Sequence, residues 1–171
     1  MSKNKREGYL IALVLIALYF SLLENLVPKP FPWMKIGLAN LATIIALEKF
    51  DKKMAFEVVG LRIIIQGLML GTLFTPGFFV SLTAGTASTG VMVFLYNFRK
   101  NLSLMAISSF SAVVHNITQL FVVYFLMFRN IDVYTKSILS FVLLFLALGW
   151  ASGMVTGYLG ERLNLRRRIR N

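Results

Sequence analysis

Long apolar runs, separated by short polar or Pro/Gly-containing breaks, fill most of this chain. The runs cover residues 8–27, 33–48, 54–73, 79–98, 103–128 and 137–159. A helix needs about 20 apolar residues to cross the hydrocarbon core of a bilayer, and only the second run is clearly shorter. The pattern predicts an all-α integral membrane protein with six transmembrane helices, forming a single transmembrane domain over residues 1–171.

The breaks and the N-terminus refine this prediction. Residues 28–32 contain three prolines, which cannot continue a helix and predict a short, stiff loop. The basic start followed by an apolar run is similar to a signal peptide. However, the run over 8–27 is long for one and lacks a small-residue cleavage site, so we interpret it as a retained first helix.

Positive charge is distributed unevenly between the two sets of helix ends. If the spans alternate in direction, thirteen of the 18 Lys and Arg residues fall on one side of the membrane. The four on the other side are Lys29, Lys35, Arg129 and Lys136, and Arg62 lies within a span. Because cytoplasmic loops carry the excess of Lys and Arg, both termini are predicted in the cytoplasm, with the chain in the cytoplasmic membrane.

Composition excludes several classes of function. The net charge of +11 arises from residues at helix ends, which argues against a nucleic-acid partner. With no Cys and one His, the chain offers no thiolate or His cluster for a metal, and no cofactor is expected. The seven acidic residues are scattered, and no Gly-rich phosphate-binding loop occurs, so we expect neither an enzyme nor an ATPase.

Polar residues inside the apolar runs are the candidates for function, because ionisable groups in a bilayer are costly unless paired or hydrated. Arg62 and Gln66 share one face of the third span, and a second polar face on the fifth span reaches a similar depth. We expect an outward-facing pocket for a small anionic molecule. Its predicted binding residues are Glu24, Lys35, Asn40, Arg62, Gln66, His115, Asn116 and Gln119. The aromatic residues predicted to cover it are Phe31, Trp33, Phe78 and Phe79.

A structural interpretation competes with the binding interpretation. Glu24 or Glu57 would then neutralise Arg62, and the side-chain amides would hold neighbouring helices together. For Glu57 the geometry is unfavourable, because it lies about 140° round the helix from Arg62. Small residues in the fourth and sixth runs predict close helix contacts. They are Ala84, Gly85, Ala87, Ser88, Gly90, Gly149, Ala151, Ser152, Gly153 and Gly157.

Several sequence blocks together resemble one bacterial membrane family. The most specific block runs from Glu24-Asn25-Leu26-Val27-Pro28 to Lys35-Ile36-Gly37-Leu38-Ala39-Asn40. Further blocks are Leu61-Arg62, Gly71-Thr72-Leu73, Ser81-Leu82 with Ala84-Gly85, and His115-Asn116 with Gln119. The resemblance is to the heptaprenyl diphosphate synthase component I family, also described as the Gx transporter family.

This resemblance implies two roles. One is a bundle similar to the substrate-binding S components of energy-coupling factor transporters, which pair with a transmembrane coupling subunit driven by ATPases. The other is a partner of a prenyl synthase catalytic subunit in making the menaquinone side chain. Prenyl transfer needs Asp-rich pairs that hold Mg²⁺, and this chain has none.

The sequence therefore supports three hypotheses. We favour a substrate-binding membrane subunit of an uptake transporter, whose partners would be a small-molecule ligand, the lipid bilayer and a coupling subunit. The alternative is a non-catalytic membrane component of heptaprenyl diphosphate synthesis. The third is a structural membrane partner without a ligand.

Overall fold

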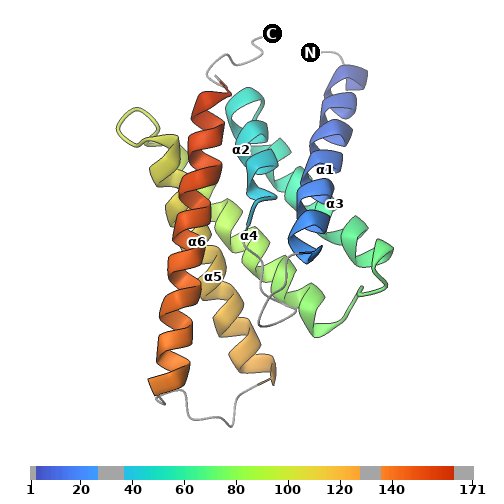
Figure 1. Cartoon of the computed structure of the whole chain (residues 1–171). Helices are drawn as coiled ribbons and strands as arrows, with labels where there is room; N and C mark the ends of the chain where they lie inside the picture. Colours follow the sequence, from blue (N-terminus) through green and yellow to red (C-terminus); the bar gives the residue numbers. More distant parts are fainter. Residues whose placement is uncertain (1–2, 27–36, 128–135, 164–171) are drawn as a thin grey trace.

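The computed structural model describes residues 3–26, 37–127 and 136–163, and this part of the chain is helical (Figure 1). It contains six helices and no strand, which confirms the all-α prediction. The helices are α1 (Lys3–Leu26), α2 (Asn40–Lys49), α3 (Lys52–Met69), α4 (Pro76–Tyr96), α5 (Leu104–Met127) and α6 (Lys136–Arg162).

Four helices of the described chain are long and apolar enough to cross a membrane. These stretches are Lys3–Leu26, Pro76–Tyr96, Leu104–Leu126 and Leu139–Arg162. Large apolar side chains on their outer faces, such as Phe121 and Leu143, are more than half exposed, as expected where lipid replaces water as the solvent. The chain is therefore a multi-pass membrane protein.

The second predicted span differs most from the structure. Helix α2 has ten residues, which is about 15 Å of helix and half the thickness of the hydrocarbon core. It begins at Asn40 and not at residue 33, because Gly37 has a φ of 100° and residues 38 and 39 form a turn. Residues 33–36 lie outside the described part. The six-span count therefore stays a prediction.

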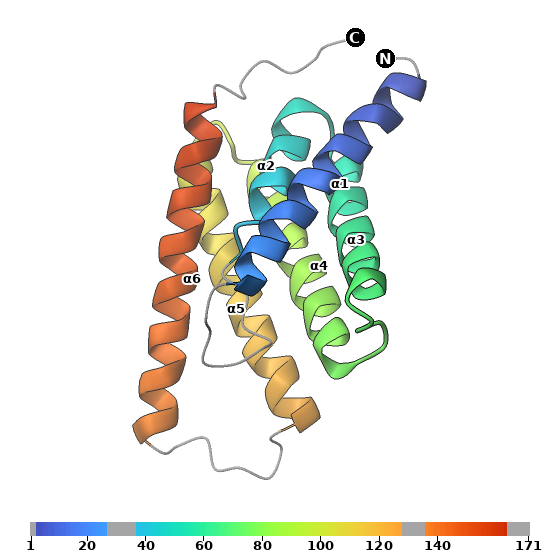
Figure 2. The same ribbon diagram turned by 45° about the vertical axis from the view of Figure 1, so that its right-hand side comes forward.

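Helix α2 lies among α1, α3 and α6, in the half of the bundle nearer the start of α1 (Figures 1 and 2). Helix α5 makes the most extensive contacts, with α6 on one side and α4 on the other, and α3 packs between α1 and α4. Figures 1 and 2 show that α1 begins and α6 ends at the same end of the molecule. This agrees with the predicted placement of the helix ends on alternating sides.

The interface between α5 and α6 is held close by glycines of α6. A Cβ atom on Gly153 would lie 2.6 Å from the Cα of Ser109, and one on Gly157 would lie 2.4 Å from the Cα of Met105. Real Cβ atoms do not approach backbone this closely, so only glycine fits at these two positions. The predicted close helix contact is confirmed for α6.

Charged side chains connect the helix ends at the end where α1 begins, which we call the basic end. Arg99 donates to Glu48 at 2.8 Å, which joins the end of α4 to the end of α2. Arg6 of α1 donates to Glu57 of α3 at 2.7 Å. Glu161 of α6 accepts from the backbone N–H of Leu104 at 2.9 Å, at the start of α5.

Candidate functional site

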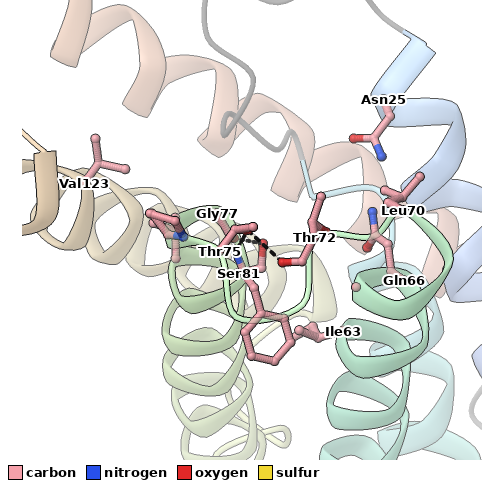
Figure 3. A pocket seen from close by; sticks show the side chains of 13 residues that line it. Asn25, Ile63, Gln66, Leu70, Thr72, Thr75, Gly77, Ser81 and Val123 are labelled. Atoms are coloured by element: carbon pink, nitrogen blue, oxygen red, sulfur yellow. Dashed lines mark hydrogen bonds between the residues drawn. The ribbon is translucent and has the colours of Figure 1, made fainter.

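A cavity of about 340 Å³ opens at the opposite end of the bundle, which we call the cavity end. It lies between the ends of α1 and α3, the start of α4 and the last turns of α5. Figure 3 shows polar side chains from several elements around it. Its lining residues are Asn25, Ile63, Gln66, Gly67, Leu70, Thr72, Thr75, Pro76, Gly77, Phe78, Val80, Ser81 and Val123. None of these carries a formal charge, so the described lining is neutral and mostly apolar.

The turn between α3 and α4 forms the rim of the cavity. Helix α3 ends in a Schellman motif, in which the N–H of Thr72 bonds the carbonyl of Gly67 at 2.9 Å and Gly71 has a φ of 64°. Thr75 then caps α4: its side chain accepts from Phe78 N–H at 3.4 Å, and Pro76 follows in the first turn. Local turn chemistry thus places Thr72 and Thr75 at the cavity.

Gln66 is the one predicted binding residue of the described chain that lines this cavity. It is buried, and its Oε1 accepts a hydrogen bond from the hydroxyl of Ser21 on α1 at 2.8 Å. The same side chain therefore faces the cavity and ties α3 to α1. Asn25, adjacent to the predicted residue Glu24, also lines the cavity.

Arg62 lies one turn deeper than Gln66 on α3 and is only 5% exposed. Its Nε has no hydrogen-bond partner, and no carboxylate of the described residues lies within 4.0 Å of its guanidinium. Glu57 pairs with Arg6 instead, which confirms that it is not the partner of Arg62. The Glu24 carboxylate attracts Arg62 electrostatically but is bonded to the backbone N–H of Leu38.

His115 joins α5 to α4 through a chain of buried polar groups. Its Nδ1 lies 3.3 Å from the hydroxyl of Ser88, which donates to the carbonyl of Gly85 at 3.1 Å. Its Nε2 lies 3.0 Å from Nε2 of Gln119, one turn along α5. The Oε1 of Gln119 is buried without a partner. If the amide nitrogen of Gln119 donates to Nε2, the ring proton of His115 sits on Nδ1 and points to Ser88.

Asn116 faces α6 and not α3. Its Nδ2 donates to the backbone carbonyl of Phe145 at 2.8 Å, which is an interhelical bond of the kind that the structural interpretation expects. A Cβ on Gly149 would lie 2.1 Å from that Nδ2, so Gly149 makes the room for this bond.

The remaining predicted residues lie apart from the cavity lining. Asn40 is buried at the start of α2, and Glu24 is buried near the end of α1. Lys35, Phe31 and Trp33 fall outside the described residues. Of the predicted aromatic cover, Phe78 lines the cavity, while Phe79 packs edge-on against Phe78 and is half-exposed.

The structure adds site residues that reasoning from the sequence did not propose for binding. They are Asn25, Thr72, Thr75 and Ser81, with Phe74 at the rim, where it contacts Phe78 in an edge-on ring pair. Three of these residues lie in the blocks that carry the family resemblance, namely Asn25, Thr72 and Ser81. The family resemblance was the sequence signal that could have indicated these residues. A lone Thr or Ser in an apolar run does not indicate a binding site by itself, because its side chain usually bonds its own helix backbone.

The acidic groups of the described chain do not form a metal site: no group of three or more His, Cys, Asp or Glu side chains comes together there. Five of the described acids instead have a structural partner each. Glu48 and Glu57 bind arginines, Glu24 and Glu161 accept from backbone N–H groups, and Asp51 caps α3 at Met54.

One comparison with known proteins identifies a family. A family model described as heptaprenyl diphosphate synthase component I matches residues 13–163, which is nearly the whole chain. No curated protein and no solved structure matches the chain significantly. The similarity to S components of energy-coupling factor transporters therefore stays a prediction.

Proposed function

Because this chain belongs to the heptaprenyl diphosphate synthase component I family, we propose that it is a non-catalytic membrane component of heptaprenyl diphosphate synthesis. Its partner would be a separate synthase catalytic subunit. This role replaces the uptake transporter as the leading hypothesis, because the family match supports it directly and nothing in the comparisons supports transport.

The hydrogen bonds and ion pairs of the acidic residues support the non-catalytic part of the proposal. Transfer of a prenyl diphosphate needs paired carboxylates to hold Mg²⁺ on the leaving group. In the described chain, Glu48 and Glu57 are each within 2.8 Å of an arginine nitrogen, and Asp51 and Glu161 bond backbone N–H groups on different helices. These acids hold helix ends in place, so the transfer chemistry belongs to the partner.

The cavity is the feature that such a component would contribute. It has room for part of a small amphipathic molecule, since its apolar wall of Ile63, Phe78 and Val80 is interrupted by Gln66 and Ser81. Pockets of this kind, largely apolar with a few convergent polar groups, are typical ligand sites. We propose that the cavity holds a prenyl compound or a molecule derived from one.

The position of the cavity favours a second function. If the basic end lies in the cytoplasm, as the distribution of Lys and Arg predicts, the cavity faces the outer half of the membrane. A site that opens outward suits a substrate-binding subunit of an uptake system. Such a subunit would need separate coupling and ATPase subunits.

Two measurements on the purified full-length chain in lipid nanodiscs distinguish these functions. The first adds the chain to the catalytic subunit of the same cell and follows incorporation of a radiolabelled five-carbon prenyl precursor. We expect no product from the chain alone and an increase in heptaprenyl product from the mixture. Nanodiscs without the chain are the control.

The second measurement is native mass spectrometry of the same preparation. A bound prenyl compound supports the synthesis role. A bound polar solute, together with an unchanged rate in the first assay, would transfer support to the uptake function. An unchanged rate with no bound molecule would leave only the structural partner.

A further inference from the structure

Arg62 carries a charge in the interior of the bundle without a matching short-range partner. Its side chain is 95% buried, and Nε makes no hydrogen bond. A buried arginine of this kind is strongly unfavourable unless an anion compensates it, because both the lost hydration and the unmade hydrogen bonds cost free energy.

The acids of the described chain do not supply that compensation at short range. Glu24 is the one whose charge acts on Arg62, and its Oε1 already accepts from Leu38 N–H. Glu57, on the same helix as Arg62, binds Arg6. Glu48 binds Arg99 at the basic end. The pattern is selective, since Arg6 and Arg99 at the basic end have carboxylate partners and the buried Arg62 has none among the described residues.

The position of Arg62 relates it to the cavity. Three helices contribute lining residues that each have a neighbour one turn deeper in the bundle. The lining residues are Gln66 of α3, Ser81 of α4 and Val123 of α5. The residues one turn deeper are Arg62, Gly85 and Gln119. We call these three residues, each one helical turn from a lining residue, the deeper layer.

This layer contains two buried polar atoms without partners, Nε of Arg62 and Oε1 of Gln119. Between α3 and α5, α4 presents Gly85, which has no side chain. A Cβ at that position would lie 3.8 Å from Nη2 of Arg62 and 2.8 Å from Cδ1 of Ile63. Gly85 therefore lets α4 pack closely against α3 at the level of the guanidinium, where only side-chain ends of α3 face it.

We propose that Arg62 binds a phosphate or diphosphate group of the molecule held in the cavity, with the Gln119 amide as a second polar contact. A guanidinium suits this role, because its planar set of N–H donors matches phosphate oxygens in pairs. We infer that the group is an anion because the buried guanidinium of Arg62 is positively charged. That it is a phosphate, and not a carboxylate, rests on the proposed function in prenyl diphosphate metabolism.

Binding of defined probes to the full-length chain in nanodiscs tests the proposal independently of any synthase activity. The probes are farnesyl diphosphate, the uncharged alcohol farnesol, and inorganic diphosphate. We expect farnesyl diphosphate to bind at least about tenfold more tightly than farnesol, the ratio that one charged hydrogen bond supplies. Inorganic diphosphate that binds equally well would identify the free anion as the ligand; weaker binding would identify the prenyl lipid.

Arg62→Met and Arg62→Lys are the informative variants. Methionine keeps much of the volume and removes the charge, so we expect it to abolish the preference for farnesyl diphosphate over farnesol. Lysine keeps the charge but not the fork of donors, so it should retain part of that preference. Arg162→Met, at an exposed arginine of the basic end, is the matched control and should bind like the unmodified chain.

Thermal unfolding of the ligand-free variants separates a binding arginine from a structural one. A binding arginine without a partner costs stability, so Arg62→Met should melt at the same temperature as the unmodified chain or higher. If Arg62→Met melts earlier while keeping the preference for farnesyl diphosphate, Arg62 is structural and the proposal is wrong. An unmodified chain that binds neither diphosphate probe also overturns it.

Glu24→Gln provides a second test. Glutamine can still accept from Leu38 N–H, but it removes the negative charge that competes with a bound anion, so diphosphate should bind more tightly. If Glu24 were the structural counter-ion of Arg62, diphosphate affinity would stay unchanged and both single variants would lose stability. That result contradicts the proposal.

Discussion

At the basic end of the bundle, the buried carboxylate of Glu48 lies 2.8 Å from the guanidinium of Arg99. Nearer the cavity end, the buried guanidinium of Arg62 has no carboxylate of the described residues within 4.0 Å. Both groups sit inside the same small helical bundle, and both would be costly to leave unpaired. The described chain therefore completes an ion pair at the basic end and leaves Arg62 without one, which is the observation behind the proposed anion site.

Glycines show the same contrast between the two ends. At the basic end, Gly157 of α6 is closed in by the backbone of Leu104 and Met105 of α5, with no space for a Cβ. Towards the cavity end, Gly85 of α4 faces side-chain ends of α3, including the Arg62 guanidinium. Backbone packed against backbone makes a rigid seam, whereas the side-chain ends that face Gly85 can change conformation.

The comparison predicts its largest effect at the α5–α6 seam. In Gly157→Ala, the new Cβ would meet the backbone of Met105 at 2.4 Å, so the helices must separate. We expect a loss of about 3 kcal/mol in the free energy of unfolding, the upper part of the usual range for overpacking. Unfolding in a detergent titration measures it. The control is Gly60→Ala, which places a methyl group where nothing lies within 4 Å and should not lose stability.

Breaking the buried ion pair comes next. Glu48→Gln keeps the shape of the side chain but removes the charge that faces Arg99, and we expect a loss of about 2 kcal/mol, the value of a hydrogen bond between charged groups. The same titration measures it. As a control, Glu7→Gln changes an exposed glutamate and should alter stability by less than about 0.5 kcal/mol. Equal losses in both variants would mean that the basic end is not held by specific pairing.

A smaller effect is expected at the cavity rim. Gly71 has a φ of 64°, so Gly71→Ala places a side chain in the left-handed region at a cost of about 1 kcal/mol. Since nothing lies within 4 Å of the added Cβ, this cost is conformational and not steric. A loss above about 3 kcal/mol would show instead that the rim turn is part of the folding core.

The smallest effect on stability is expected inside the cavity. Val123→Phe extends a larger apolar side chain into open space, and we expect a gain of about 0.5 kcal/mol. The same variant should lose any molecule that co-purifies with the unmodified chain, as native mass spectrometry would show. A ligand retained by Val123→Phe would place the binding site elsewhere in the protein.

Much of the architecture was predictable from the residues alone. The apolar runs predicted six helices, because a long apolar run in a membrane protein forms a helix of about the same length. The spacing of Gly149, Gly153 and Gly157 by four residues placed them on one face of α6, where they close the seam with α5. Basic residues near alternate helix ends indicate which end of the bundle is the basic end.

The site depended on the tertiary structure. Helical periodicity shows that Arg62 and Gln66 share a face, but not which neighbour that face meets. The packing of α3 against α1 brings Gln66 within hydrogen-bond distance of Ser21, and the packing of α3 against α4 places Arg62 beside Gly85. Likewise, the pairing of His115 with Ser88 joins residues 27 positions apart, and no local rule predicts it.

Which segments are helical, and which of their positions must be small or charged, follows from the residues alone, because the bilayer and the geometry of a single helix set these features. The tertiary structure decided where the cavity opens, which turn residues line it, and which buried charge has no partner. These depend on how several helices rotate against each other, and that rotation is set by contacts between residues far apart in the chain.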